Sequence, residues 1–254
     1  MYRYPKIIYL LILLPLLFGC HTHTINHLDN VKDNQKNITR LNLSYQNLTE
    51  IPAIVFEMEN LKVLNLNSNK ITKIPPEIGK LIHLEKLILS NNKIVDIADE
   101  IGYLKALKKL SLRTNKISQL PASIGDLKRL EILKIGFNQL VELPDEIKNL
   151  ENLTQLYAEY NRLEFLPNEL GSLNLTDLFI NQNNLKTLPN SFYELSSLIR
   201  LNISNAGNAI TLKNEICKLR RIEQLTIDFN TLTFAPRCLE IRARSNPRFS
   251  ITIN

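Results

Sequence analysis

The sequence contains few histidines and cysteines, which enzymes often use as bases and nucleophiles. Among its 254 residues are four histidines, three cysteines and no tryptophan. Three of the histidines precede residue 28, which leaves His83 as the only histidine between residues 38 and 241. No Ser-His-Asp set and no Cys-His pair with the character of a nucleophile is visible. We therefore predict that the chain is not an enzyme and that it needs no cofactor.

Glycine, proline and net charge are also limited. The seven glycines and eleven prolines are sparse outside a set of regularly repeated positions, so no linker between domains is visible. The formal charge is +6 and falls to +4 without Arg3 and Lys6. Acidic residues are scattered throughout, and no basic helix or known nucleic-acid motif is present. The composition thus predicts one elongated domain that does not bind nucleic acid.

The apolar run near the start of the chain is too short to cross a membrane. Arg3 and Lys6 precede the run, which covers residues 7–18. A membrane span needs about 20 residues, so this run fits the core of a secretory signal. The small residue Gly19 before Cys20 resembles the lipobox of bacterial lipoproteins, which implies cleavage before Cys20 and a diacylglyceryl group on its thiol. An ordinary secretory signal and an uncleaved anchor are the alternatives.

A lipid on Cys20 would hold the protein on a membrane without a spanning helix. We therefore expect an extracytoplasmic protein of the bacterial cell envelope, with the outer-membrane surface as one location. Residues 20–37 are polar and predict a flexible tether and N-terminal cap. His21, His23 and His27 lie in this tether. Histidines without a fixed second shell make a weak metal site, so we expect no bound metal.

Residues 38–241 contain one pattern repeated nine times, in steps of 22 to 24 residues. Its copies begin at Ile38, Leu61, Leu84, Leu107, Leu130, Leu153, Leu175, Leu198 and Ile222. Apolar residues recur three and five positions after each start and alternate with polar residues, as in a short half-buried strand. One copy cannot bury its apolar face alone. Stacked copies can, and strands about 4.8 Å apart would form a ladder of about 38 Å.

Asparagine and proline also recur at fixed positions. The residue eight positions after each start is asparagine in seven copies and is replaced by Gln46 and Ala206 in the other two. These asparagines are Asn69, Asn92, Asn115, Asn138, Asn161, Asn183 and Asn230. An amide offers both a donor and an acceptor to the backbone of a buried turn, so we interpret the set as a structural ladder. Proline, six positions later in seven copies, predicts a return side of 3₁₀ or short helical turns.

The pattern LxxLxLxxNxLxxLPxxIxxLxx resembles the leucine-rich repeat family in its 23-residue form, over residues 38–241. The resemblance implies an α/β solenoid of about nine repeats, curved, with parallel strands on the concave face and 3₁₀ turns on the convex face. It also implies a role in binding proteins and, by itself, no catalytic activity. The alternating tail at 249–253 predicts a capping strand, so we divide the chain into a signal (1–19), tether (20–37), repeats (38–241) and cap (242–254).

Two cysteines remain after Cys20. Cys217 and Cys238 fall on the return sides of adjacent copies, two positions out of equivalence, so their backbones could approach disulfide distance. An oxidising compartment would favour a bond between them, and two separately buried thiols are the equal alternative.

The side chains predicted to face out of the concave surface are unusual in copies three to seven. These positions lie two, four, six and seven residues after each start. In the middle copies they carry cations and aromatic rings, namely Lys86, Lys109, Arg113, Lys134, Phe137, Tyr157, Tyr160 and Phe179. Adjacent strands would bring the four rings into one patch about 10 Å wide, a composition typical of an interface centre. The alternative is that the rings only cover one another and the lysines are solvated charges.

The leading hypothesis is a lipid-anchored recognition protein that binds a protein or peptide ligand with an acidic segment on this face. The partner would be a host protein, as for an adhesin, or another envelope protein. One alternative is carbohydrate binding at the rings, which the lack of tryptophan disfavours. Another is a targeting module of an enzyme complex, and the short segment after Ile241 leaves no room for a catalytic domain in the same chain.

Overall fold

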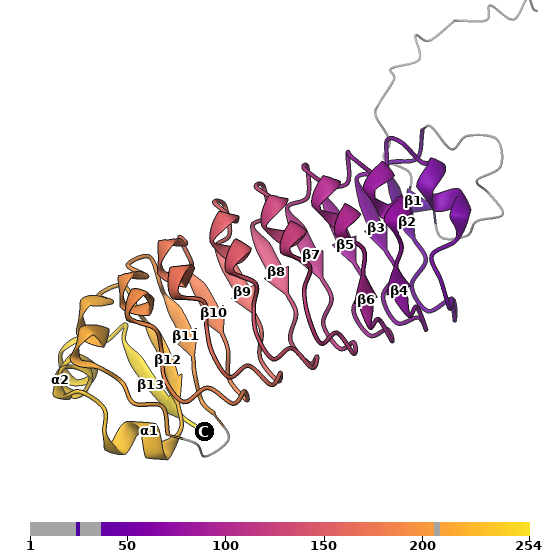
Figure 1. Ribbon diagram of the computed structural model, residues 1–254. Coiled ribbons are helices and arrows are strands. Elements are labelled where there is room, and N and C mark those ends of the chain that lie inside the picture. Colours follow the sequence, from indigo (N-terminus) through magenta and orange to yellow (C-terminus); the bar gives the residue numbers. More distant parts are fainter. Residues whose placement is uncertain (1–23, 26–36, 206–208) are drawn as a thin grey trace, which may run out of the picture.

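The computed structural model describes residues 24–25, 37–205 and 209–254 and shows a solenoid with one long parallel sheet (Figure 1). In order across the sheet, its strands are β1 (Thr24–Ile25), β2 (Arg40–Asn42), β3 (Val63–Asn65), β5 (Lys86–Ile88), β7 (Lys109–Ser111), β8 (Ile132–Lys134), β9 (Gln155–Tyr157), β10 (Asp177–Phe179), β11 (Arg200–Asn202), β12 (Gln224–Ile227) and β13 (Ser250–Ile253). The predicted solenoid is confirmed. The predicted signal at 1–19, Cys20 and the three tether histidines lie outside the described residues.

Neighbouring strands pair one copy apart. Leu41 of β2 pairs with Leu64 of β3, Leu64 pairs with Leu87 of β5, and the same step continues to Leu201 and Leu225. Because the register equals the repeat length, side chains at one position of the repeat form a column across the sheet. The leucine column at this position is at most 1% exposed from Leu41 to Leu225. The residues on either side of it therefore point away from the core.

The return side of most copies is a 3₁₀ turn, as the prolines predicted. These turns are η3 (Ala53–Glu57), η4 (Pro76–Lys80), η5 (Asp99–Tyr103), η6 (Ala122–Asp126), η7 (Asp145–Asn149), η8 (Asn168–Ser172), η9 (Asn190–Glu194) and η10 (Asn214–Lys218). Proline stands directly before six of them, and Ala98 and Lys213 take its place before η5 and η10. A second, two-stranded sheet joins β4 (Lys73–Ile74) to β6 (Asp96–Ile97).

The asparagines close the turn after each strand. The side-chain amide of Asn115 donates to the carbonyls of Leu112 in its own copy and Leu89 in the preceding copy, at 2.9 and 3.0 Å. Its oxygen accepts from the Ile94 amide at 3.0 Å. Asn69, Asn92, Asn138, Asn161 and Asn183 make the same kind of contacts. Each amide thus satisfies backbone groups of two copies at once.

The ladder ends differently from the prediction. Asn205, one residue before the predicted Ala206, accepts from the Asn183 amide at 3.1 Å. In the last copy, Asp228 caps a short helix by accepting from the Thr231 amide at 2.8 Å. Asn230 lies exposed inside that helix, so its assignment to the ladder was wrong. The helix replaces the asparagine turn, because the cap must cover the last copy rather than continue into another.

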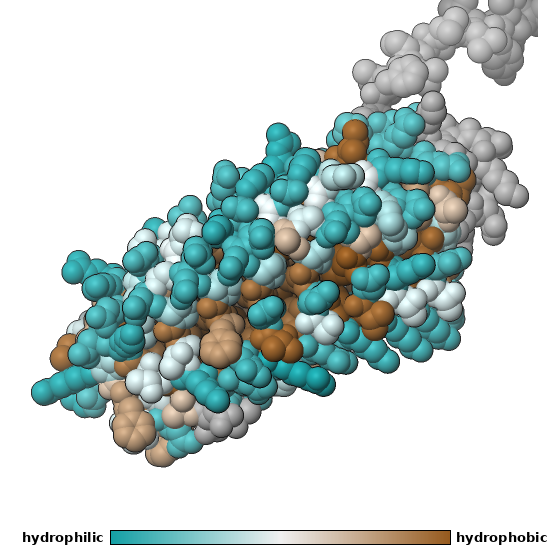
Figure 2. Space-filling view, viewed as in Figure 1, coloured by the Kyte–Doolittle hydropathy of each residue, from teal (hydrophilic) through white to brown (hydrophobic). Residues whose placement is uncertain are grey.

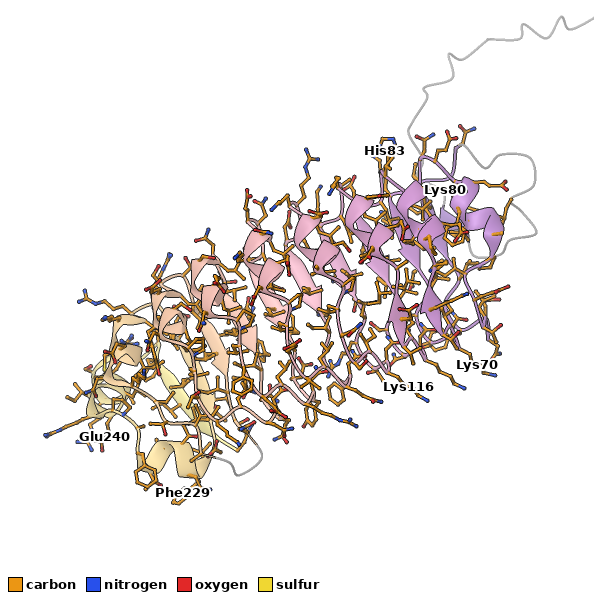
Figure 3. All side chains as sticks on the ribbon, viewed as in Figure 1. Lys70, Lys80, His83, Lys116, Phe229 and Glu240 are labelled. Atoms are coloured by element: carbon orange, nitrogen blue, oxygen red, sulfur yellow. A yellow bond between two sulfur atoms is a disulfide. The ribbon has the colours of Figure 1, made fainter. Side chains whose placement is uncertain are left out.

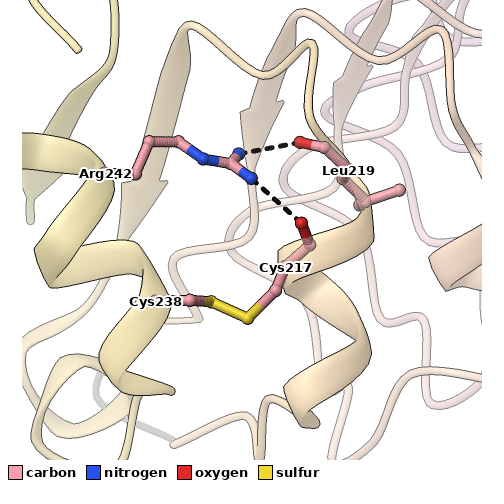
Figure 4. Close-up of a disulfide and its surroundings, with 4 residues drawn as sticks. All are labelled: Cys217, Leu219, Cys238 and Arg242. Atoms are coloured by element: carbon pink, nitrogen blue, oxygen red, sulfur yellow. Dashed lines mark hydrogen bonds between the residues drawn. A yellow bond between two sulfur atoms is a disulfide. The ribbon is translucent and has the colours of Figure 1, made fainter. Parts of the chain in front are cut away.

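The C-terminal cap consists of α1 (Phe229–Thr233), α2 (Arg237–Ser245) and β13. A disulfide joins Cys217 of η10 to Cys238 of α2, whose Cα atoms are 6.0 Å apart (Figure 4). In the same place, the Arg242 guanidinium donates to the carbonyls of Leu219 and Cys217 at 2.8 and 3.0 Å (Figure 4). At the other end of the sheet, β1 lies within the predicted tether and pairs with β2.

The solenoid has two long edges that differ in their position along the repeat. Lys80 and His83 lie on the edge that precedes the strands, and Lys70 and Lys116 lie on the opposite edge (Figure 3). On the face seen in Figure 2, hydrophilic side chains follow both edges and an apolar band lies between them. Within the described ranges, no helix has the length and apolar character required to span a bilayer.

Candidate ligand-binding face

All eight predicted concave residues lie on the strands β5 to β10 or in the turns that directly follow them. Within each strand the central leucine is buried, and its two neighbours lie on the other side of the sheet, where most are partly exposed, as for Lys86 and Ile88 around Leu87. Ser111 and Asp177 are the buried exceptions. Pairing one copy apart then places the eight residues in two groups of columns. One group lies on the strands, and the other lies where the chain turns after them.

The four rings form two stacked pairs rather than one continuous cluster. Tyr157 and Phe179 are direct partners on β9 and β10, and their ring centroids are 5.0 Å apart. Phe137 and Tyr160 stack in the following turns, with centroids 4.2 Å apart. The two pairs are three residues apart along the chain, which corresponds to about 10 Å. Each stacked pair contributes about 0.5–1.5 kcal/mol beyond the burial of its area.

A cation covers the first ring of each pair. The Arg113 guanidinium lies 4.4 Å from the centroid of Phe137, and the Lys134 ammonium lies 4.6 Å from the centroid of Tyr157. Each cation comes from the copy before its ring, and the second ring comes from the copy after it. The order across the sheet is therefore cation, ring, ring in both sets, shifted by one strand. Both faces of Phe137 and of Tyr157 are occupied by neighbouring side chains.

Glu159 lies between the two ring pairs and was not predicted as part of the site. Its carboxylate is 3.3 Å from the Arg113 guanidinium, two copies away, and its side chain is only 11% exposed. The contact crosses Gly136 of the intervening copy. A Cβ atom on Gly136 would lie 2.6 Å from Glu159 Oε1, so only glycine leaves the carboxylate this path. Within the described part of the chain, Glu159 Oε2 is buried without a hydrogen-bond partner.

The sequence signal for this pair lies in the comparison of successive copies and not in any single copy. The residue six positions after the first residue of a copy is mostly serine or asparagine. In three successive copies this residue is Arg113, Gly136 and Glu159. A cation, a gap and an anion in consecutive copies indicate a contact across two copies. A second ion pair was missed in the same way, between the Asp177 carboxylate and the Arg200 guanidinium on neighbouring strands.

The remaining cations give the face its positive character. Lys86 and Lys109 are direct partners on β5 and β7, both half-buried, and neither forms an ion pair with a described residue. The pKa of Lys134 is lowered, first because burial disfavours the ammonium and then because Lys109 and Arg113 lie nearby; Glu159 opposes this shift. Burial likewise raises the pKa of the Tyr157 hydroxyl, with a smaller contribution from Asp177. The cations are thus close enough to repel one another.

The backbone under the second ring pair is unusual for aromatic residues. Phe137 and Tyr160 have φ angles of 57° and 53°, in the left-handed region. The equivalent position carries Tyr45, Ser68, Asn91, Thr114 and Gln182 in other copies, all with positive φ. Bulky side chains are uncommon in this region, and asparagine is several-fold enriched there. The repeat therefore does not favour rings at this position, and stacking with Arg113 and with each other offsets part of the cost.

The parallel strand ladder, the asparagine column and the 3₁₀ return turns together define a solenoid of leucine-rich units. Two family models agree with this class. The model described as leucine-rich repeat region matches residues 77–161, and the model described as leucine rich repeat matches residues 36–79. The chain is a leucine-rich repeat protein. No curated protein sequence gives a match.

Solved structures of other leucine-rich repeat proteins share the fold. The plant peptide hormone receptor RGFR1, in complex with RGF2, is 29% identical over 90% of this chain, with a TM-score of 0.73. The ectodomain of the receptor kinase GASSHO1/SCHENGEN3 from Arabidopsis thaliana, in complex with CASPARIAN STRIP INTEGRITY FACTOR 2, is 27% identical over 85% with a TM-score of 0.70. An internalin, InlF from Listeria monocytogenes, is 23% identical over 86% with a TM-score of 0.72 and shows the fold alone.

This chain spans only part of each of these proteins. It covers 36% of the RGFR1 chain, 27% of the GASSHO1/SCHENGEN3 chain and 62% of the internalin chain. What the chain shares with them is the architecture of a protein-interaction module.

Proposed function

We propose that this chain is a non-enzymatic recognition protein that binds a protein or peptide ligand with an acidic segment on its concave face. The observation that carries the proposal is the pair of cation-ring-ring sets at Arg113, Phe137 and Tyr160 and at Lys134, Tyr157 and Phe179. Rings and arginine are enriched at the energetic centres of protein interfaces. The ammonium groups of Lys86 and Lys109, which pair with no carboxylate among the described residues, extend the positive charge toward the N-terminal copies and would attract carboxylates.

The stacking favours a peptide over a sugar at this place. A sugar ring packs on an open aromatic face, and both faces of Phe137 and Tyr157 are covered by neighbouring side chains. The open parts are the ring edges and the outer rings, which suit apolar side chains of a peptide. Two plant receptors with this fold were solved with a peptide hormone or a protein factor bound, which supports a ligand of the same class here.

We further propose that the protein is anchored by a lipid on Cys20 and acts outside the cytoplasm, in the bacterial cell envelope, where it would serve as an adhesin or a receptor for another envelope protein. The disulfide between Cys217 and Cys238 supports an oxidising compartment, because such bonds persist mainly outside the cytoplasm. Metabolic labelling with a radioactive fatty acid tests the anchor: a Cys20→Ser variant should lose the label. Retention of the label in that variant would contradict lipidation at this residue.

Selection of peptides from a random display library on the immobilised chain tests the binding function. We expect the selected peptides to be enriched in aspartate and glutamate next to apolar residues. A parallel selection on the Tyr157→Ala/Phe179→Ala variant should not recover them. A matched control removes two aromatic residues elsewhere, Phe229 and Phe234, which are 67% and 75% exposed on the cap. Peptides recovered equally from all three proteins would disprove the concave site.

A further inference from the structure

The C-terminal end of the solenoid carries a polar groove that is separate from the two ring pairs. A cavity of about 630 Å³ is lined by Arg220, Arg221 and Arg248, together with Glu223 and Asn246. The first two arginines lie in the turn between η10 and β12, and Arg248 lies just before β13. Arg221 precedes the ninth copy as His83 precedes the third, so the groove opens on the long edge that His83 marks in Figure 3.

The net positive charge of residues 37–254 is concentrated at this C-terminal end. Residues 37–212 contain 19 lysines and arginines and 19 aspartates and glutamates, whereas residues 213–254 contain eight of the former and four of the latter. Within the described ranges, none of the three groove arginines forms an ion pair. Three guanidinium groups around one cavity, with a single carboxylate among the lining side chains, make an anion-attracting site.

A fourth arginine lies behind the groove in a fixed position. Arg242 is held by two backbone carbonyls, of Leu219 and Cys217 (Figure 4). Its guanidinium also lies 5.3 Å from the centroid of the Phe249 ring. The pKa of Arg242 is lowered, first by burial and then by the nearby charge of Arg220. The disulfide between η10 and α2 keeps this arrangement in place. The fixed Arg242 guanidinium thus adds positive charge near Arg220.

The groove continues along the same edge into a neutral segment, whose own charged residues, Asp177 and Arg200, pair with each other. A neighbouring cavity of about 410 Å³ shares Ile199 and Glu223 with the first and is also lined by Gln155, Thr176, Gln224 and this ion pair. The two cavities follow strands β9 to β13, a distance of about 19 Å at the usual strand spacing. The amide and hydroxyl groups of this segment can donate to and accept from the hydroxyl groups of a ligand. The lining thus combines three guanidinium groups at one end with uncharged hydrogen-bonding groups and one ion pair at the other.

We propose that this arginine groove binds a glycan that carries sulfate or phosphate groups. Guanidinium groups match such oxyanions through paired hydrogen bonds, and the neutral segment would bind the sugar hydroxyls. A glycan is favoured over an acidic peptide because the Thr176 hydroxyl and the Gln155 and Gln224 amides can pair with several sugar hydroxyls beside the arginines. A lipid surface fits less well, because none of the large exposed apolar side chains lies in its lining.

Calorimetry with two defined probes tests the proposal and separates the two anions. The probes are a heparin-derived hexasaccharide and an oligosaccharide that carries mannose 6-phosphate, each compared with its desulfated or dephosphorylated form. We expect at least one probe to bind, and its uncharged form to bind more weakly. Loss of two guanidinium contacts in an Arg220→Ala/Arg221→Ala variant should weaken binding at least about tenfold. Arg248→Ala, on the other side of the groove, should weaken it as well.

The matched control removes the same charge from the same end of the molecule. Arg237 and Arg244 of α2 are exposed and lie outside the groove, so an Arg237→Ala/Arg244→Ala variant should keep its affinity within about twofold. An equal loss in this control would show attraction to net charge alone and would overturn the proposal. The absence of binding to both probes would also overturn it. So would binding to phosphatidylglycerol vesicles that the Arg220→Ala/Arg221→Ala variant loses while its binding to both oligosaccharides is unchanged. Because the ring pair in the turns lies outside the groove lining, Phe137→Ala/Tyr160→Ala should leave glycan binding unchanged.

Discussion

The concave face is filled differently in the first copies and in the middle copies, although the scaffold beneath it is the same. In the first two copies, small polar side chains bond to each other: the Asn65 amide and the Ser44 hydroxyl each donate to the Asn42 side-chain oxygen at 2.9 Å. In the middle copies the same columns hold rings and charged groups, such as Tyr157 and Lys134. The repeat therefore determines the shape of the molecule, and the free positions determine what it can bind.

The largest predicted effect tests whether the two regions share one scaffold. Leu64→Ala in the first copies and Leu133→Ala in the middle copies each remove a side chain that is 0% exposed. Each should lower the free energy of unfolding by about 2–5 kcal/mol, since a cavity adds to the lost burial. Urea unfolding followed by circular dichroism measures both. A cost confined to one of the two variants would show that the scaffold is not equivalent in the two regions.

A smaller loss is expected from the asparagine ladder. Asn138 donates to the carbonyls of Leu112 and Ile135 and accepts from the Ile117 amide, at 2.9 to 3.1 Å. Asn138→Ala leaves these buried backbone groups without partners and should cost about 2–3 kcal/mol. Asn184, which is exposed, is the matched control, and its replacement by alanine should cost less than about 0.5 kcal/mol. Equal costs in urea unfolding would argue against the ladder as a structural element.

The contact across two copies provides a prediction specific to the middle copies. In Gly136→Ala the new methyl group would displace the Glu159 carboxylate and weaken its pairing with Arg113. We expect a loss of about 1 kcal/mol, typical of mild overpacking. The same substitution in a Glu159→Ala background should be nearly neutral, because nothing is left to displace. A thermal-unfolding cycle of the four proteins measures the coupling, and equal costs in both backgrounds would contradict it.

The smallest effect concerns proton binding at Lys134. Its pKa lies below the ordinary 10.5, because burial and the charges of Lys109 and Arg113 disfavour the ammonium. The folded state then binds this proton more weakly than the unfolded state. The contribution to stability should therefore rise with pH between the lowered pKa and 10.5. Glu159→Gln removes the opposing anion and should lower the pKa further. NMR titration of methylated lysines, assigned with Lys134→Arg, measures it, and a raised pKa in Glu159→Gln would refute the described arrangement.

The scaffold was predictable from the sequence because its contacts recur at a fixed spacing from copy to copy, as the strand pairing and the asparagine bonds do. The leucine spacing alone gave strands such as β5 and β7, and the prolines gave the 3₁₀ turns. The pairing of Cys217 with Cys238 depended on backbone positions that spacing left open, and the structure brings their Cα atoms to 6.0 Å. The role of Glu159 could not be predicted from its own copy, since its partner lies two copies away across a glycine.

The end of the chain departs from the sequence prediction for a different reason. The repeat pattern placed Asn230 in the ladder, but the last copy has no following copy to stack on its turn. Asp228 instead caps α1, and the cap covers the core with β13 and α2. Signals of this kind belong to the end of a solenoid and do not repeat, so periodicity cannot reveal them.

The affinity of a selected acidic peptide for three proteins tests the central claim, that the ring pairs of the middle copies form the ligand site. Calorimetry would compare the unmodified chain, Tyr157→Ala/Phe179→Ala, and Asn42→Ala/Asn65→Ala as the equivalent change in the first copies. We predict that loss of the rings weakens binding by at least about 1 kcal/mol while the loss in the first copies has little effect. Normal binding by the ring variant, or an equal loss in both, would contradict the claim.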